Sequence, residues 1–397
     1  MHEHVTIPEI TNPAQAGYYG GNQVVLLPGG AAYFERVAWL INNAQHSLHV
    51  QVYILGNDAT GHQVVNGLVE AANRGVAVYL VLDKFASQHL PAKTILMLRQ
   101  AGVRFRWFGA FFYNQYFYFG RRLHHKVLVA DGCKAITGGI NLADRYNDVD
   151  DIPAWLDWGV YIEGPAAAAM EVVCLKIWNR IFTSKERKIF PTPAQLPVQS
   201  TGPVYVRVRR NDWLNRKVQI TRSYVEMLNL AQHRVCMISP YFLPSRQLCK
   251  RMQRAVKRGV QVQVITPGKS DVWVAKQAER YLYPMLLKYG VRIYEYQPRI
   301  LHGKLSIYDG KWVTIGSYNI NNISATASVE LNVDVLDKPF AQQVQAQLEA
   351  IKHQDCLEMS AADFLGNRKW WQRAIQWGCY QFIRLMLFLF TFYFRQR

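Results

Sequence analysis

Two nineteen-residue segments of the chain carry the same pattern of histidine, lysine, aspartate, glycine and asparagine. The first, LHHKVLVADGCKAITGGIN, spans residues 123–141, and the second, LHGKLSIYDGKWVTIGSYN, spans residues 301–319. Both fit His-x-Lys-x4-Asp-x6-Gly-[Gly/Ser]-x-Asn, and the two are offset by 178 residues throughout. A lone histidine or lysine is most often a core or surface residue, but a pair repeated with identical spacing indicates a shared function.

The residue types suit phosphoryl transfer without a metal ion or other cofactor. Residues i and i+2 of a strand point to the same face, so each motif histidine projects together with its lysine. Two lysines can neutralise phosphate oxygens, asparagines can donate hydrogen bonds, and two histidines can serve as nucleophile and as acid and base. The candidate catalytic residues are His124, Lys126, Asp131, His302, Lys304 and Asp309, and the candidate substrate-binding residues are Asn141, Asn319 and Ser317.

Composition narrows the class of protein without choosing its partner. The 397 residues include 46 Lys and Arg against 28 Asp and Glu, and half of the chain is hydrophobic. This apolar content excludes a disordered chain, and ordinary Gly, Pro and Cys contents exclude collagenous and disulfide-scaffold proteins. The net charge of +18 favours an anionic partner, which could be nucleic acid, an acidic membrane or a phosphorylated substrate. The first ten residues resemble neither a signal peptide nor a membrane anchor.

The repeat extends upstream of the motifs and predicts the architecture. Residues 43–55 parallel residues 230–243, and residues 65–83 parallel residues 250–266, so each half is expected to run helix, strand, helix, strand. We therefore predict an α/β protein with two domains related by a pseudo-twofold axis. Each domain would be a mixed β-sheet flanked by helices, with the active site between the domains. The expected divisions are an N-terminal extension (1–20), a first domain (21–182), a linker (183–203), a second domain (204–355) and an amphipathic C-terminal segment (356–397).

The doubled motif resembles the phospholipase D superfamily over roughly residues 20–340. The resemblance implies a covalent phosphohistidine intermediate, with His124 as nucleophile and His302 as acid and base, although the order could be reversed. It also implies a carboxylate behind each histidine that fixes the orientation of the ring. Asp157 follows His124 by 33 residues and Glu330 follows His302 by 28, so we expect Asp157 to orient His124 and Glu330 to orient His302.

Two further expectations concern the acids and the small residues of the motifs. Asp131 and Asp309 precede glycine and are expected to shape turns and pair with nearby cations rather than contact substrate. Gly139 stands where the second motif has Ser317, so a hydroxyl contact to phosphate would exist on one side only. This difference suggests unequal roles for the two histidines.

Two aromatic segments suggest contact with a membrane. Residues 105–119 contain ten aromatic side chains in fifteen positions and are followed by Arg121 and Arg122, which fits a loop dipping into lipid headgroups better than a core strand pair. The apolar run Leu385–Phe394 is only ten residues, too short to span a bilayer. With its flanking tryptophans and basic residues, the C-terminal segment favours an anchor lying on the membrane surface, over a helix packed on the enzyme body or a tilted spanning helix.

The stretches SPYFLPS, PGKSDV, TGGINLADRYND and DWGVYIEGPA resemble bacterial cardiolipin synthases of the short, peripheral type. That resemblance implies phosphatidyl transfer between two phosphatidylglycerol molecules at the cytoplasmic side of the cell membrane. The expected partner is an anionic phospholipid membrane, without nucleic acid, and the chain is a monomer or an oligomer of unknown size. A phospholipase D that uses water is the alternative, and a phosphodiesterase or nuclease is a more distant one.

Overall fold

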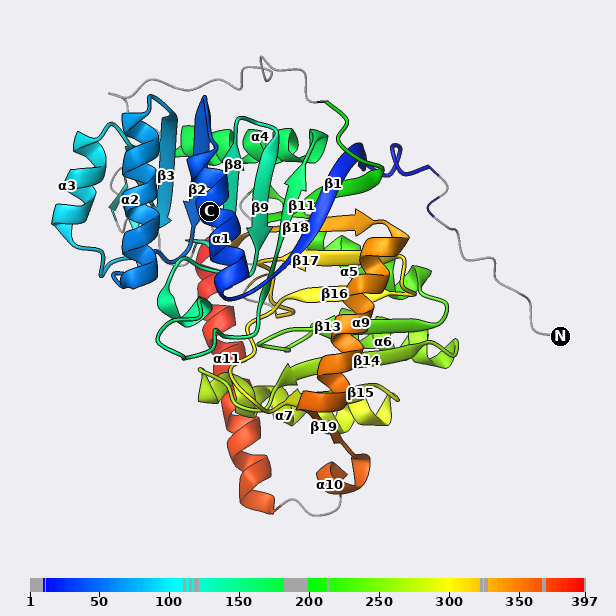
Figure 1. Ribbon diagram of the computed structural model, residues 1–397. Helices are drawn as coiled ribbons and strands as arrows, with labels where there is room; N and C mark the ends of the chain where they lie inside the picture. The colour runs from blue at the N-terminus through cyan, green and yellow to red at the C-terminus, as the bar shows by residue number, and fades with distance from the viewer. Residues whose placement is uncertain are drawn as a thin grey trace.

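The computed structural model describes residues 10, 12–109, 112–113, 116–117, 121–181, 199–212, 215–321, 324, 328–365 and 369–395 (Figure 1). The first half contains β1 (Tyr19–Pro28), α1 (Ala31–Asn42), β2 (Ser47–Val52), α2 (Ala59–Asn73), β3 (Ala77–Asp83), α3 (Ala92–Gln100), β4 (Arg104–Phe108), β5 (Phe112–Tyr113), β6 (Tyr116–Phe117), β7 (Arg122–Leu123), β8 (Val127–Ala130), β9 (Lys134–Gly138), the 3-10 helix η1 (Asp144–Tyr146), β10 (Trp158–Glu163) and α4 (Pro165–Arg180).

The second half repeats this order. It contains β11 (Val204–Asp212), β12 (Lys217–Val218), α5 (Gln219–Leu230), β13 (Arg234–Ile238), α6 (Arg246–Lys257), β14 (Gln261–Pro267), α7 (Trp273–Lys288), β15 (Arg292–Tyr296), β16 (Leu305–Tyr308), β17 (Trp312–Gly316), β18 (Ser328–Leu336), α9 (Lys338–Asp355), β19 (Cys356–Met359), α10 (Ala361–Leu365) and α11 (Trp370–Arg395). The helix and strand order expected from the sequence repeat is confirmed.

The two sheets have matching topologies. In the first half, β4, β3 and β2 run parallel, and β8, β9, β10 and β1 follow as antiparallel neighbours. The second half places β15, β14 and β13 in parallel, followed by β16, β17, β18 and β11 in antiparallel pairs. The starts of β1 and β11 pair with each other, through Tyr19 with Val206 and Asn22 with Val204. The predicted fold of two mixed sheets flanked by helices is therefore correct.

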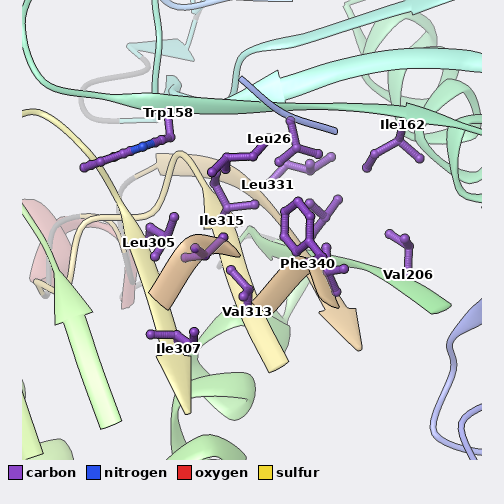
Figure 2. Close-up of a cluster of buried hydrophobic side chains, with 14 of the residues drawn as sticks. Leu26, Trp158, Ile162, Val206, Leu305, Ile307, Val313, Ile315, Leu331 and Phe340 are labelled. Carbon is purple, nitrogen blue, oxygen red and sulfur yellow. The ribbon is translucent and has the colours of Figure 1, made fainter. Parts of the chain in front are cut away.

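A shared hydrophobic core joins the halves. Helices α1 to α3 cover the outer face of the first sheet, and α5 to α7 cover the outer face of the second. Between the sheets, α4 and α9 pack into one buried cluster with strands of both halves (Figure 2). Its labelled members are Leu26, Trp158, Ile162, Val206, Leu305, Ile307, Val313, Ile315, Leu331 and Phe340. Because this core is continuous, it holds the inner edges of the two sheets in a fixed relation.

The aromatic run after β3 only partly fits the expectation from the sequence. Its first residues form β4, where Phe105 and Phe108 are buried in the protein, so this part is core rather than a membrane loop. The side chains of residues 110–120 lie outside the described residues. Arg121 forms an ion pair with Asp212 at 2.7 Å, and Arg122 stacks over Phe85. These two charges therefore serve internal contacts rather than an outer surface.

The C-terminal segment begins later than expected. Strand β19 pairs with β15 and so extends the second sheet, because residues 356–359 complete its edge. Helix α11 then packs its Gln376, Cys379, Tyr380 and Ile383 side against the second half, mainly on α7. Of the helices in the described part of the chain, none is long and apolar enough to cross a membrane.

Candidate active site

Each motif enters its sheet by pairing with the opposite half. Strand β7 lies parallel to β18, and the amides of both His124 and His125 donate to the carbonyl of Val329 at 3.0 Å. In the same way, the amides of His302 and Gly303 donate to the carbonyl of Leu156 at 2.8 and 2.9 Å. The residue that follows each of these carbonyls bears a carboxylate: Glu330 follows Val329, and Asp157 follows Leu156. Each histidine is thus delivered to the acid of the other half.

The carboxylates therefore cross between the halves. His124 Nδ1 lies 2.9 Å from Glu330 Oε2, and His302 Nδ1 lies 2.6 Å from Asp157 Oδ2. The prediction that Asp157 holds His124 and Glu330 holds His302 is wrong, because the strand pairing places each acid beside the opposite motif. In both rings Nδ1 is taken by a carboxylate, which leaves Nε2 free to react. Both pairs thus present the nitrogen that can attack phosphorus or carry a proton.

The two motif lysines lie deep in the same site. Both are almost fully buried, Lys126 at 0% exposure and Lys304 at 1%. Each Nζ donates to the carbonyl of the histidine two residues before it, and Lys304 Nζ also lies 2.9 Å from His302 Nδ1. Burial, followed by the charge of Lys304, lowers the pKa of Lys126 to about 7, and burial lowers the pKa of Lys304 to about 8. Lys304 Nζ lies 4.0 Å from Asp157 Oδ2, and a bound phosphodiester would bring further negative charge to the two ammonium groups.

The histidines and their acids are also shifted by burial. Burial lowers the pKa of His124, and the charge of Glu330 opposes this shift. For His302, burial and then the charges of Lys304 and Lys126 hold the pKa well below its usual value. Burial raises the pKa of Asp157 to about 7. The ring of His124 is consequently neutral at pH 7, which is the form required of a nucleophile, whereas His302 must take up a proton before it can act as an acid.

The two histidine–carboxylate pairs are supported differently. Ser317 donates its hydroxyl to Glu330 Oε2 and accepts the amide of Leu331 at 3.2 Å. At the matching position, Gly139 lies so close that an added Cβ would stand 2.3 Å from Asp157 Oδ1. The expectation that Ser317 contacts phosphate does not match this geometry, because its hydroxyl is committed to the acid that holds His124. Ser317 is therefore a positioning residue in this structure.

The two motif asparagines also differ. Asn141 uses both ends of its amide inside the protein, since Oδ1 accepts the amide of Ile54 at 3.2 Å and Nδ2 donates to Tyr146 Oη at 2.9 Å. Asn319 is 5% exposed, and its Oδ1 is buried without a hydrogen-bond partner. Of the two, Asn319 therefore has the amide oxygen that is still available to a substrate hydroxyl.

The motif acids lie at the far ends of their strands. Asp131 and Asp309 have φ of 54° and 49° and, with the glycines that follow, form the tight turns that the Asp-Gly pairs predict. The carboxylate of Asp131 accepts the amides of Gln45, His46 and Ser47. That of Asp309 accepts the amides of Gln232, His233 and Arg234. A four-residue strand of about 13 Å separates each acid from its histidine, so these acids anchor loops and do not join the reacting groups.

Aromatic rings frame both histidines, and the sequence did not reveal them. Tyr53 lies against His124 with ring centroids 5.0 Å apart, while Tyr146 and Trp155 lie 5.1 and 6.0 Å from His302. Only Tyr53 could have been noticed in the sequence, because the upstream repeat aligns it with Tyr241. His125 is fully buried with Nε2 2.9 Å from Gln51 Oε1, as expected of a structural histidine.

The described residues contain no group of His, Cys, Asp and Glu side chains that could hold a metal ion. The arrangement instead gathers two histidine rings held by carboxylates and two buried ammonium groups whose charges act on those rings. Such a set can bind a phosphodiester, attack its phosphorus and exchange the alcohol attached to it.

Comparisons with known proteins agree with this geometry. A family model described as "Cardiolipin synthase, PLD-like domain" matches residues 37–152 and 224–352. The chain is 30% identical to cardiolipin synthase B of Salmonella typhimurium over 93% of its own length and 90% of the relative. It is 31% identical to cardiolipin synthase A of Pseudomonas aeruginosa over 83% of its length and 66% of that relative. Phosphatidylserine synthase of Haemophilus influenzae has the same fold, with a TM-score of 0.69 at 14% identity over 94% of this chain and 97% of that one.

Proposed function

The chain belongs to the cardiolipin synthase family with phospholipase D-like domains and is a phospholipid phosphatidyltransferase, and on this premise we propose that it joins two phosphatidylglycerol molecules into cardiolipin through a phosphohistidine intermediate. One observation supports the proposal: the crossed pairs occupy Nδ1 of both His124 and His302, so Nε2 is the ring nitrogen left to react beside two buried lysines. Neither half can assemble this site alone.

In the first step, Nε2 of His124 attacks the phosphorus of the donor lipid. The P–N bond forms as the P–O bond to glycerol breaks. His302, protonated on Nε2 once the anionic donor raises its pKa, gives the leaving oxygen that proton. Glu330 stabilises the positive charge that develops on His124, while Lys126 and Lys304 neutralise the oxygens of the transition state. The donor diester is an anion. Its negative charge favours the protonated form of the two lysines, whose pKa values are lowered by burial.

In the second step, the hydroxyl of the acceptor attacks the same phosphorus. His302 Nε2 takes the proton of that hydroxyl, the new P–O bond forms, and the P–N bond breaks with its electron pair returning to His124. Asp157 then stabilises the protonated His302 ring at 2.6 Å. Cardiolipin results when the acceptor is the glycerol of a second phosphatidylglycerol, whereas water as acceptor would give phosphatidic acid.

The products distinguish these outcomes directly. The protein is incubated with phosphatidylglycerol vesicles, and the lipids are identified by mass spectrometry. We expect cardiolipin and free glycerol in equal amounts. Phosphatidic acid as the main lipid product would instead identify a hydrolase, and an unchanged lipid pool would remove lipids as the substrate class. Circular duplex DNA incubated in parallel is expected to stay intact.

We also propose that α11 holds the enzyme on an anionic membrane surface. Along the side of this helix that faces away from α7, Trp371, Ile375, Phe382 and Leu385 are each between 41% and 53% exposed, and Trp370 is 80% exposed. Such a stripe of apolar and tryptophan side chains suits the boundary between headgroups and acyl chains. Lys369, Arg373 and Arg384 are exposed basic residues at other positions of the same segment, and the helix sequence contains no acidic residue.

A vesicle-binding experiment tests this surface. Replacing Trp371, Ile375 and Phe382 together with serine is expected to lower binding to phosphatidylglycerol vesicles by at least tenfold, because about 25 cal/mol is lost for each Å² of buried apolar area. Sedimentation of the full chain with vesicles gives the bound fraction. Three serine replacements on the outer helix α3, at Leu96, Met97 and Ile95, provide a control of similar size. Equal binding of both triple variants would contradict the proposal.

A further inference from the structure

Charged and polar groups near the site gather on one side of it, beside His302. Arg145 is exposed, and its guanidinium lies 5.4 Å from the ring centroid of Tyr146 and 5.2 Å from that of Trp155. These are the two rings that pack on His302. Among the described residues, no carboxylate forms an ion pair with Arg145. The aromatic rings therefore hold a cation whose charge faces solvent at the entrance beside His302.

A second exposed group lies on the same side. Tyr241 donates its hydroxyl to both carboxylate oxygens of Asp271, at 2.8 and 2.9 Å. The segment carrying Tyr241 is tied to the second motif, because the amide of Leu243 donates to the carbonyl of Ile320, the residue after Asn319. Asp271 itself follows β14 and is exposed. A carboxylate that spends one acceptor position on a tyrosine keeps others for the hydroxyls of a ligand.

The charges of these groups also act on residues of the second motif. Burial dominates the pKa of Lys304, yet the charge of Asp271 also raises it. Burial and Asp271 raise the pKa of Tyr241, and the charge of Arg145 opposes that shift. Arg145 also adds to the lowering of the pKa of His302 that burial and the lysines cause. Because Arg145 lies on the rings that pack on His302, and the segment of Tyr241 is hydrogen-bonded next to Asn319, these groups belong to the acid–base side of the site.

Among the described residues, the side of His124 carries a different set of groups, with Arg122 stacked over Phe85 and 4.0 Å from the buried Asp83. Tyr53 matches Tyr241 in the repeat. The residues after β3, however, form hydrogen bonds within their own loop and to the backbone of Tyr53. Asp83 is fully buried and accepts backbone amides, including that of Phe85, and Ser87 donates to the carbonyl of Tyr53. Among the described residues here, no exposed carboxylate pairs with Tyr53. The two ends of the site therefore differ in what they can recognise.

We propose that Arg145 and the Tyr241–Asp271 pair form the subsite for the alcohol that enters and leaves beside His302. Asp271 accepts hydrogen bonds from glycerol hydroxyls, and Arg145 binds the phosphate that an acceptor phospholipid carries at the other end of its glycerol. This inference rests on the proposed function, in which His302 handles the alcohol in both steps. It names the acceptor class as an anionic phospholipid with a free glycerol hydroxyl, rather than a simple alcohol.

Competition between acceptors tests the subsite. The full chain is given phosphatidylglycerol with a labelled acyl chain, and products are counted for three acceptors: water, free glycerol that carries a second label, and unlabelled phosphatidylglycerol. Arg145→Gln is expected to lower the ratio of cardiolipin to phosphatidic acid at least tenfold, with a smaller change in transfer to free glycerol. Asp271→Asn is expected to lower transfer to both glycerol-bearing acceptors relative to water. Arg254→Gln, on the exposed side of α6, is the matched control and is expected to keep all three ratios.

The outcomes separate the two proposals. Parallel loss of all three products in Arg145→Gln would show that the arginine acts only on His302 or on folding, and would overturn the subsite. Unchanged product ratios in both variants, with cardiolipin still formed, would overturn the subsite and leave the proposed function standing. Phosphatidic acid as the sole product of the unaltered enzyme with every acceptor would overturn both.

Discussion

The two halves of the molecule share a fold and a motif but support their histidines in different ways. His124 is held by the longer acid Glu330, which Ser317 reinforces with a hydroxyl group. His302 is held by Asp157, which lies against Gly139 and accepts the amide of Trp158 at 2.7 Å. The difference teaches that two equivalent scaffolds hold their rings in unequal surroundings when a few neighbouring side chains differ, as the proposed division into nucleophile and acid–base requires.

The largest effect on activity is expected from variants that remove the two histidine rings. His124→Ala and His302→Ala are each expected to lower turnover of phosphatidylglycerol by about 10⁴-fold, because the groups of a catalytic unit fail together. With a donor that carries a p-nitrophenyl leaving group, His302→Ala should still form a stable adduct on His124, since that leaving group needs no proton. Intact-protein mass spectrometry detects the adduct.

The assignment of roles depends on which variant is labelled. An adduct in His124→Ala, with none in His302→Ala, would reverse the two roles. Substantial turnover of the natural donor by either variant, at about a tenth of the normal rate, would remove that histidine from the mechanism.

The crossed acids provide a second, smaller contrast. Glu330→Gln and Asp157→Asn keep the shape of each side chain but remove its charge, and we expect losses of roughly 10- to 1,000-fold. Because Asp157 stabilises the protonated His302, the loss in Asp157→Asn should shrink with a p-nitrophenyl donor, while the loss in Glu330→Gln should persist. Comparing rates for the two donors measures this. Equal sensitivity of both variants to the leaving group would show that the halves are functionally equivalent.

The pH dependence of donor binding is the mildest of the three effects. The pKa of Lys126 is lowered to about 7 and that of Lys304 to about 8. A lysine with a lowered pKa loses its charge as the pH rises through that value, so affinity for the anionic donor should fall above this window. We expect kcat/KM to drop by about tenfold between pH 7 and pH 9.

The profile of kcat should stay flat to a higher pH, because a bound phosphate raises the pKa of both lysines. Initial rates over a range of donor concentrations at each pH separate the two parameters. A kcat/KM that stays constant from pH 7 to pH 10 would mean that both lysines keep their charge in the empty site.

The sequence predicted what depends on local spacing and missed what depends on distant pairing. The Asp-Gly turns, the strands around them and the position of both histidines follow from short-range pattern, and all are found. The crossing of Asp157 and Glu330 could not be read in this way, because equal repeats fit either pairing and spacing along the chain favoured the wrong one. Phe105 and Phe108 were misassigned for a related reason: aromatic density alone does not separate a buried strand from an exposed loop.

The subsite groups lie in stretches that resemble cardiolipin synthases, but the sequence did not assign them a role. Arg145 lies in a 3-10 turn and Asp271 in a loop more than a hundred residues away, and neither belongs to the repeated pattern. Only the folded chain brings them to the same end of the site. Residues that break the internal symmetry are thus the ones that a search for repeats overlooks.

The crossed pairs also determine when the enzyme becomes able to react. The contact between His124 and Glu330 spans 206 residues, and the contact between His302 and Asp157 spans 145. Contacts between such distant residues form late in folding, because a large loop must close before they contribute. After His124 has been synthesised, translation must continue past Glu330 before the ring of His124 can contact its carboxylate. The growing chain therefore cannot react with the surrounding lipids until the second half has been synthesised and has packed against the first.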